Sequence, residues 1–163
     1  MSFPLRSTCL ATVACLAVAV TGCGPGYLDH GEKVPATEVN KQVFEVVKAY
    51  HAAVEAKDID TIKGMISQRY HENAGTTDRG EDDYGYDKVL ERIVMLRDNV
   101  KRVQLRLKLL GMNVGNGEAT VDYEFAGRVL LSEGGLDSYK TWNDVSRMRL
   151  AREQDRWMIV GGL

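Results

Sequence analysis

The chain has 163 residues, of which 44% are hydrophobic and 27% charged, and its formal net charge is −2 at pH 7. This length accommodates a single domain. The near-neutral charge, without a basic block interleaved with aromatic residues, argues against nucleic acid as a partner.

The first 22 residues have the pattern of a secretory signal peptide. Arg6 precedes an apolar run over residues 10–20, which is too short to span a membrane but suits a signal-peptide core. The run ends in the sequence VTGC at residues 20–23, which resembles the bacterial lipobox. We therefore predict a signal peptide over 1–22 and lipid on the sulfur of Cys23, with an ordinary cleaved signal as the alternative.

The cysteines fit this prediction. Cys9 and Cys15 lie in the segment predicted to be removed, and lipid would occupy the remaining thiol of Cys23. A disulfide and a thiol nucleophile would then both be lacking, so the fold must rest on its apolar core. We expect a lipid-anchored protein of the bacterial cell envelope. Gly24, in place of the aspartate that retains lipoproteins in the inner membrane of some bacteria, favours the outer membrane.

Residues 23–38 contain several glycines and prolines and few apolar residues. This composition predicts a flexible tether between the lipid and a domain over 39–163.

Three helices are predicted at the start of this domain. Apolar residues recur at helical spacing over 39–54, which predicts an amphipathic first helix. Asp58 is expected to cap a short second helix over 59–66, and a third helix is predicted over 87–99. The polar, glycine-containing segment 70–86 between them is predicted to be mostly loop.

The remainder of the chain alternates between apolar and polar residues, which indicates strands with one buried face. Strands are predicted over 103–109, 119–131, 139–153 and 156–160. Asn116 and Gly117 predict a tight hairpin between the first two strands. Further turns are predicted at 132–136 and 154–155. Helices followed by an antiparallel meander indicate the α+β class, with the helices packed on one face of the sheet.

Three segments resemble the nuclear transport factor 2-like superfamily. They are YHAAVEAKDID at 50–60, MISQRYH at 65–71, and RMRLAREQDRWMIV at 147–160, where a charged turn precedes a strand that contains tryptophan. The resemblance spans residues 40–163 and implies a cone of curved antiparallel sheet wrapped around three helices. Members of this superfamily include isomerases, dehydratases and non-catalytic binding domains, so the fold alone does not assign a reaction.

The resemblance also implies a pocket between the first helix and the concave sheet, where enzymes of the superfamily place Asp, His and Tyr. The candidate pocket residues here are Tyr50, His51, Tyr70, His71 and Tyr123. Because no carboxylate lies in an equivalent motif, we assign no catalytic residue. Glu72 or Asp78 would serve as a base only if buried, and a solvated loop is the expectation for both.

No metal ion or cofactor is predicted. His51 and His71 lie 20 residues apart without a cysteine nearby, which is not a zinc pattern. The acidic residues between Asp78 and Asp87 have oxygen ligands suited to calcium, but their spacing does not fit an EF-hand loop. Tyr84, within this stretch, is a candidate for a recognition surface or a lid, together with Tyr86.

The polar face of the sheet is a candidate surface for a homodimer. Asp122 and Glu124 lie on this face and are expected to pair across strands with Arg128, Arg147 or Arg149.

The two tryptophans receive different predictions. Trp142, at the start of the third predicted strand, is the candidate for an exposed aromatic at an interface with another envelope protein. Trp157 is predicted to lie in the core near the first helix, with Leu150 and Met148 as its cross-strand neighbours.

Two functions follow from these features. The first is a membrane-anchored, non-catalytic binding or scaffold domain. The alternative is an isomerase-like or dehydratase-like enzyme, or a carrier, that holds a small apolar molecule in the cone. The two differ in whether a cavity lies beside the predicted pocket residues.

Overall fold

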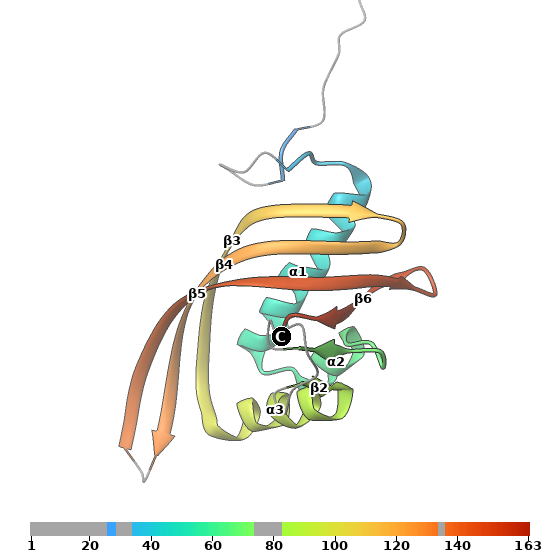
Figure 1. Cartoon of the computed structure of the whole chain (residues 1–163). Helices are drawn as coiled ribbons and strands as arrows, with labels where there is room; N and C mark the ends of the chain where they lie inside the picture. The colour runs from blue at the N-terminus through green and yellow to red at the C-terminus, as the bar shows by residue number, and fades with distance from the viewer. Residues whose placement is uncertain (1–25, 29–33, 74–82, 134–135) are drawn as a thin grey trace, which may run out of the picture.

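A computed structural model describes residues 26–28, 34–73, 83–133 and 136–163. Three helices, a long, curved antiparallel sheet and a small two-stranded sheet make up this part of the chain, and Figure 1 shows the helices inside the curve of the long sheet. This arrangement confirms the predicted α+β class and its cone shape. Among the residues described, no helix is long and apolar enough to cross a membrane. Cys23 and the predicted signal peptide lie outside the described residues.

The helices begin at the capping residues that the sequence supplies. Helix α1 spans Glu38–Ala56 and starts after Thr37, whose side chain accepts a hydrogen bond from the backbone of Asn40. Helix α2 spans Ile59–Met65, and its predicted N-cap, Asp58, accepts a bond from the backbone N–H of Thr61 at 3.1 Å. Helix α3 spans Tyr86–Asn99 and leads directly into the sheet.

The sheet consists of β3 (Val100–Gly115), β4 (Glu118–Glu133), β5 (Leu136–Glu153) and β6 (Arg156–Gly161), paired in chain order. Each strand pairs antiparallel with the next. The hairpins at 116–117 and 154–155 both have two successive residues at positive φ, the geometry of tight turns that suits the twist of paired strands. Both turns were predicted, although β3 and β5 begin earlier than expected.

The segment 70–86 contains more structure than the predicted loop. Strand β1 (His71–Glu72) pairs antiparallel with β2 (Tyr84–Gly85), and residues 74–82 between them lie outside the described part of the chain. Two-residue strands are too short to show an alternating pattern, so periodicity does not reveal this pairing.

The core lies between α1 and the concave face of the sheet. Val43 and Val47 of α1 are fully buried in one apolar cluster with Val121, Met148 and other inward residues of the sheet. Val34, inside the predicted tether, is also buried in this cluster. A parallel bridge between Ile66 and Ile159 joins the segment after α2 to β6.

Trp157 is 8% exposed and belongs to this core, as predicted. Its predicted cross-strand neighbours were wrong, because Arg152 lies opposite Trp157 and Leu150 lies opposite Ile159. The two-residue turn at 154–155 sets this register, and the irregularity between Arg149 and Leu150 lies beyond it, at the far end of the β5–β6 ladder.

On the outer face of the sheet, one predicted cross-strand ion pair is confirmed. Arg147 Nη2 donates to Asp122 Oδ2 at 2.9 Å. Glu124 instead accepts from the amide of Asn143 at 3.2 Å, so its predicted arginine partner was wrong. Asp122 and Asn143 therefore mark the polar side of a sheet whose other face holds the core.

Candidate functional site

An apolar cavity of about 180 Å³ lies between α1 and the concave face of β3, β4 and β5. Aliphatic and aromatic side chains from both layers form most of its wall. The lining residues are Tyr50, His51, Val54, Val103, Leu105, Tyr123, Phe125, Val129, Trp142, Ser146, Gly162 and Leu163. Such a cavity, apolar with a few polar groups, is the usual form of a small-molecule site.

His51 is the one histidine among the residues that line this cavity. It is 8% exposed, and its Nδ1 lies 2.9 Å from the carbonyl oxygen of Val47, one turn earlier in α1. A carbonyl oxygen only accepts hydrogen bonds, so Nδ1 carries the proton and Nε2 of the neutral ring is left as an acceptor. Burial lowers the pKa of His51 below its ordinary value of 6.5, which favours this neutral form.

Two tyrosines surround the imidazole. The rings of Tyr50 and Tyr123 both meet His51 edge-on, with centroids 5.5 and 4.9 Å away. Burial raises the pKa of both phenols, so both hydroxyls stay protonated and are able to donate hydrogen bonds. The cavity thus combines an acceptor on His51 with neutral hydroxyl groups.

Trp142 closes the cavity on the side of β5. It pairs with Gly127 of β4, and a Cβ at that position would lie only 2.5 Å from the indole ring. Trp142 also contacts Phe125 edge-on, with ring centroids 6.4 Å apart. Gly127 therefore leaves the space in which the indole lies against the sheet, and 38% of Trp142 remains exposed.

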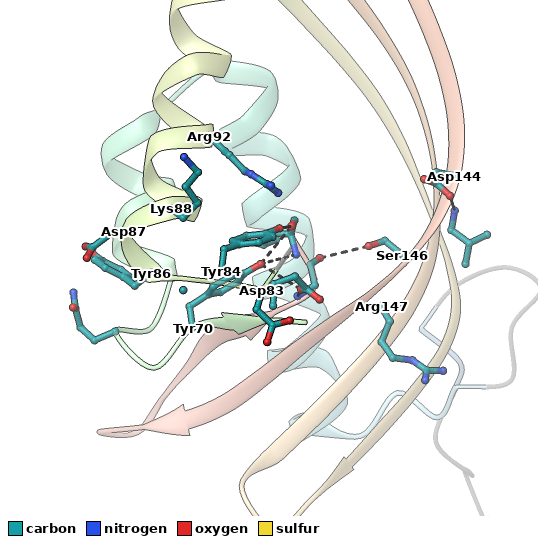
Figure 2. A pocket seen from close by; sticks show the side chains of 16 residues that line it. Tyr70, Asp83, Tyr84, Tyr86, Asp87, Lys88, Arg92, Asp144, Ser146 and Arg147 are labelled. Atoms are coloured by element: carbon teal, nitrogen blue, oxygen red, sulfur yellow. Dashed lines mark hydrogen bonds between the residues drawn. The ribbon is translucent and has the colours of Figure 1, made fainter. Parts of the chain in front are cut away.

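A wider cleft of about 1360 Å³ adjoins the cavity and shares Ser146, Gly162 and Leu163 with it. In Figure 2, Tyr84 and Arg92 lie on the side of α3, and Ser146 faces them from β5. The Tyr84 hydroxyl donates to the Leu163 carbonyl oxygen at 2.6 Å, and the Arg92 guanidinium lies 3.9 Å from the centre of the Tyr84 ring. This cleft is polar where the inner cavity is apolar.

The structure brings some of the predicted pocket residues together and separates others. Tyr50, His51 and Tyr123 line the inner cavity, together with Trp142, the predicted interface residue. Tyr70 lines the outer cleft instead, where its hydroxyl accepts from the Leu163 N–H at 3.0 Å.

His71 lines neither space. Its side chain is 59% exposed, and its Nε2 lies 3.9 Å from the Asp83 carboxylate.

Several wall residues were not among the predicted set. Val103, Leu105 and Phe125 belong to the apolar positions of the alternation, which predicts burial on one face of the sheet without distinguishing a cavity wall from the core. Ser146 and Gly162 had no distinguishing signal, because their role depends on how the end of β6 approaches β5.

Of the two acidic residues considered as general bases, the structure describes only Glu72. Glu72 accepts a hydrogen bond from the Gly162 N–H at 2.6 Å, which fixes the backbone beyond β6. Asp78 lies outside the described residues, and so do Glu81 and Asp82 of the acidic stretch. Within the described ranges, no cluster of His, Cys, Asp and Glu has the arrangement of a metal site.

Comparison with known proteins identifies the fold. No protein-family model matches the chain, and no curated protein matches it in sequence. Solved structures do match. A candidate scytalone dehydratase from Novosphingobium aromaticivorans superposes with a TM-score of 0.64 at 6% identity, over 76% of this chain and 80% of that one. A candidate dehydratase of the NTF2-like family from Streptomyces avermitilis gives 0.60 at 16% identity, over 76% and 92%. An NTF-2 like protein of unknown function from Shewanella oneidensis gives 0.55 at 15% identity, over 76% and 96%.

Proposed function

Starting from a nuclear transport factor 2-like fold with an apolar cavity behind α1, we propose that this chain is a lipid-anchored binding protein of the bacterial envelope. Its ligand is a single-ring aromatic compound with one hydroxyl group. The observation that carries the proposal is the neutral His51 in an otherwise apolar wall, with its Nδ1 committed to the Val47 carbonyl.

The size of the cavity supports a ligand of one ring. An apolar cavity of roughly 150 Å³ is enough to hold benzene in another protein, and the cavity here has about 180 Å³. The aromatic rings of Phe125, Tyr123 and Trp142 are suited to edge-to-face packing against such a ring. A ligand hydroxyl would donate to Nε2 of His51, the free acceptor nitrogen of the ring whose Nδ1 is bound to Val47.

The ligand proposal is tested by comparing 4-methylphenol with toluene, which lacks the hydroxyl. We expect 4-methylphenol to bind about tenfold more tightly than toluene, because the net free energy of one hydrogen bond corresponds to about this factor in affinity. In the His51→Leu variant, toluene should still bind and the preference for the phenol should vanish. Isothermal titration calorimetry with each compound measures both affinities.

His71→Leu is the matched control, because His71 is exposed and lines neither space. It should leave both affinities unchanged. If neither compound binds the native chain, or if the preference survives in His51→Leu, the proposed ligand class is wrong.

A catalytic role in the same cavity is the second candidate. It is favoured by the neutral imidazole beside two tyrosines, which is a set of groups able to move protons. Against it, no Asp or Glu side chain among the described residues lines the cavity, and a lowered pKa makes His51 a weak base. Appearance of a new product from a bound compound, detected by mass spectrometry, would favour this candidate over simple binding.

The anchoring proposal rests on the VTGC sequence at residues 20–23 and is tested separately. We expect the native chain to enter the detergent phase on phase separation, and the Cys23→Ser variant to lose lipid attachment completely. Mass spectrometry of the mature N-terminus should find diacylglycerol on the cysteine. Cys15→Ser is the control and should remain lipidated. A native chain that lacks lipid by mass would contradict the proposal.

A further inference from the structure

Strand β5 has a long edge that no described strand covers. Strand β6 pairs only with residues 149–153 of β5, while β4 pairs with β5 along its whole length. The ten successive residues 136–145 are all exposed. The far ends of β4 and β5 reach beyond the helices, at the lower left of Figure 1, and this accounts for the exposure of these residues.

This edge carries three charged residues among its ten, and it also exposes large apolar side chains. Leu136 is 78% exposed, Tyr139 52% and Val145 61%. Natural proteins usually protect an open edge with prolines, bulges or charges, because its backbone N–H and C=O groups are ready to pair with another strand. Over residues 136–145 there is no proline, and the paired register with β4 is continuous.

We propose that this edge pairs antiparallel with the same edge of a second copy, with the two Trp142 residues opposite each other on the twofold axis. In this register Lys140 of each copy lies opposite Asp144 of the other, and Tyr139 lies opposite Val145. Opposite charges and aromatic–β-branched pairs are both favourable across strands. The edge is therefore complementary to itself.

The register is specific, because neighbouring registers lose this complementarity. Centring the pair on Thr141 puts Lys140 opposite Trp142, and centring it on Asn143 puts Lys140 opposite Ser146. Directly opposite residues in an antiparallel pair lie on the same face of the sheet. A twofold axis that passed between two residues would put successive residues, which lie on opposite faces, opposite each other, so such registers are excluded.

The surroundings leave room for the added strand. Beyond residue 145, the outer cleft of about 1360 Å³ separates β5 from the start of α3, on the side where β6 would otherwise continue. The proposed ladder ends before Arg147, because Gly162 of the same chain already lies against the Arg147 backbone on this edge.

The test is a charge exchange in the full chain, purified in a mild detergent, with the protein mass in the micelle measured by light scattering over a concentration series. Lys140→Asp places a like-charged pair on each side of the axis and should weaken dimerisation about tenfold or more. Asp144→Lys should do the same. The double variant Lys140→Asp with Asp144→Lys restores opposite charges in this register and should dimerise within about threefold of the native chain.

Ala126→Glu separates this interface from one through the face of the sheet. Ala126 is exposed on the outer face of β4, away from the edge, and its replacement should leave the proposed dimer unchanged. A native chain that stays monomeric, a double variant as weak as the single ones, or a dimer abolished by Ala126→Glu would each overturn the proposal.

Discussion

Replacing Trp157 with alanine is expected to lower the free energy of unfolding by roughly 3–5 kcal/mol, the usual cost of deleting a large buried aromatic side chain. Trp157 is 8% exposed and packs in the same cluster as Val43 and Val47 of α1. Its removal leaves a cavity where β6 meets the helices. Such a loss is a large share of the total stability of a domain this size. Urea titration of the chain, followed by circular dichroism, measures the change.

Trp157→Phe is the informative control. The indole Nε1 of Trp157 is buried and has no hydrogen-bond partner among the described residues. Phenylalanine keeps most of the apolar surface and removes this unsatisfied donor, which costs about 1–3 kcal/mol when left unpaired in a protein interior. We therefore expect Trp157→Phe to be much less destabilising than Trp157→Ala. Equal losses for the two variants would show that the aromatic packing does not matter there.

Gly162→Ala should have the second largest effect, on stability and on the cavity together. Gly162 has φ of +90°, and a Cβ there would overlap the carbonyl oxygen of Arg147. Backbone strain of this kind costs about 1–3 kcal/mol, and the contact with fixed backbone adds to it. Relief requires moving residues 162–163, which would break the bond from the Gly162 N–H to Glu72 and displace a wall of both spaces.

The expected result is a loss of at least about 2 kcal/mol in urea titration, together with weaker binding of 4-methylphenol. Gly64 provides the matched control, since it lies in α2 and a Cβ added there would meet no heavy atom within 4 Å. Gly64→Ala should stabilise the chain by about 0.5–1 kcal/mol, because alanine favours the helix. An unchanged stability in Gly162→Ala would contradict the close approach between Gly162 and Arg147.

The sequence predicted the elements that carry a clear period. Apolar spacing over residues 39–54 and 59–66 located α1 and α2, and the cap at Asp58 was confirmed. Asn116 with Gly117 located the first hairpin, because that pair readily adopts two successive positive φ values. Such signals are local, so they are visible without knowing which elements meet.

The site was less predictable because it depends on contacts between distant segments. His51 lies on α1 and Tyr123 on β4, and the two rings come together only when the helix packs on the sheet. Their positions in the sequence do not reveal this contact. Tyr70 and His71 adjoin one another in sequence, yet one faces the cleft and the other solvent, as successive side chains of extended backbone do. Trp142 was assigned to a surface, and the absent side chain of Gly127 is what places it against the cavity.

The order β3–β4–β5–β6 has a consequence for how the chain folds. Every strand of the sheet pairs with its neighbour in sequence, so the ladders form through contacts of short sequence separation, which favours fast folding. The bridge from Ile66 to Ile159 spans most of the domain, and the Ser67 N–H donates to the Ile159 carbonyl at 2.9 Å beside it. Closing so long a loop carries a larger entropic cost than closing any of the hairpins. The meander is therefore expected to form before the helices are joined to β6, and this long-range closure sets the folding rate.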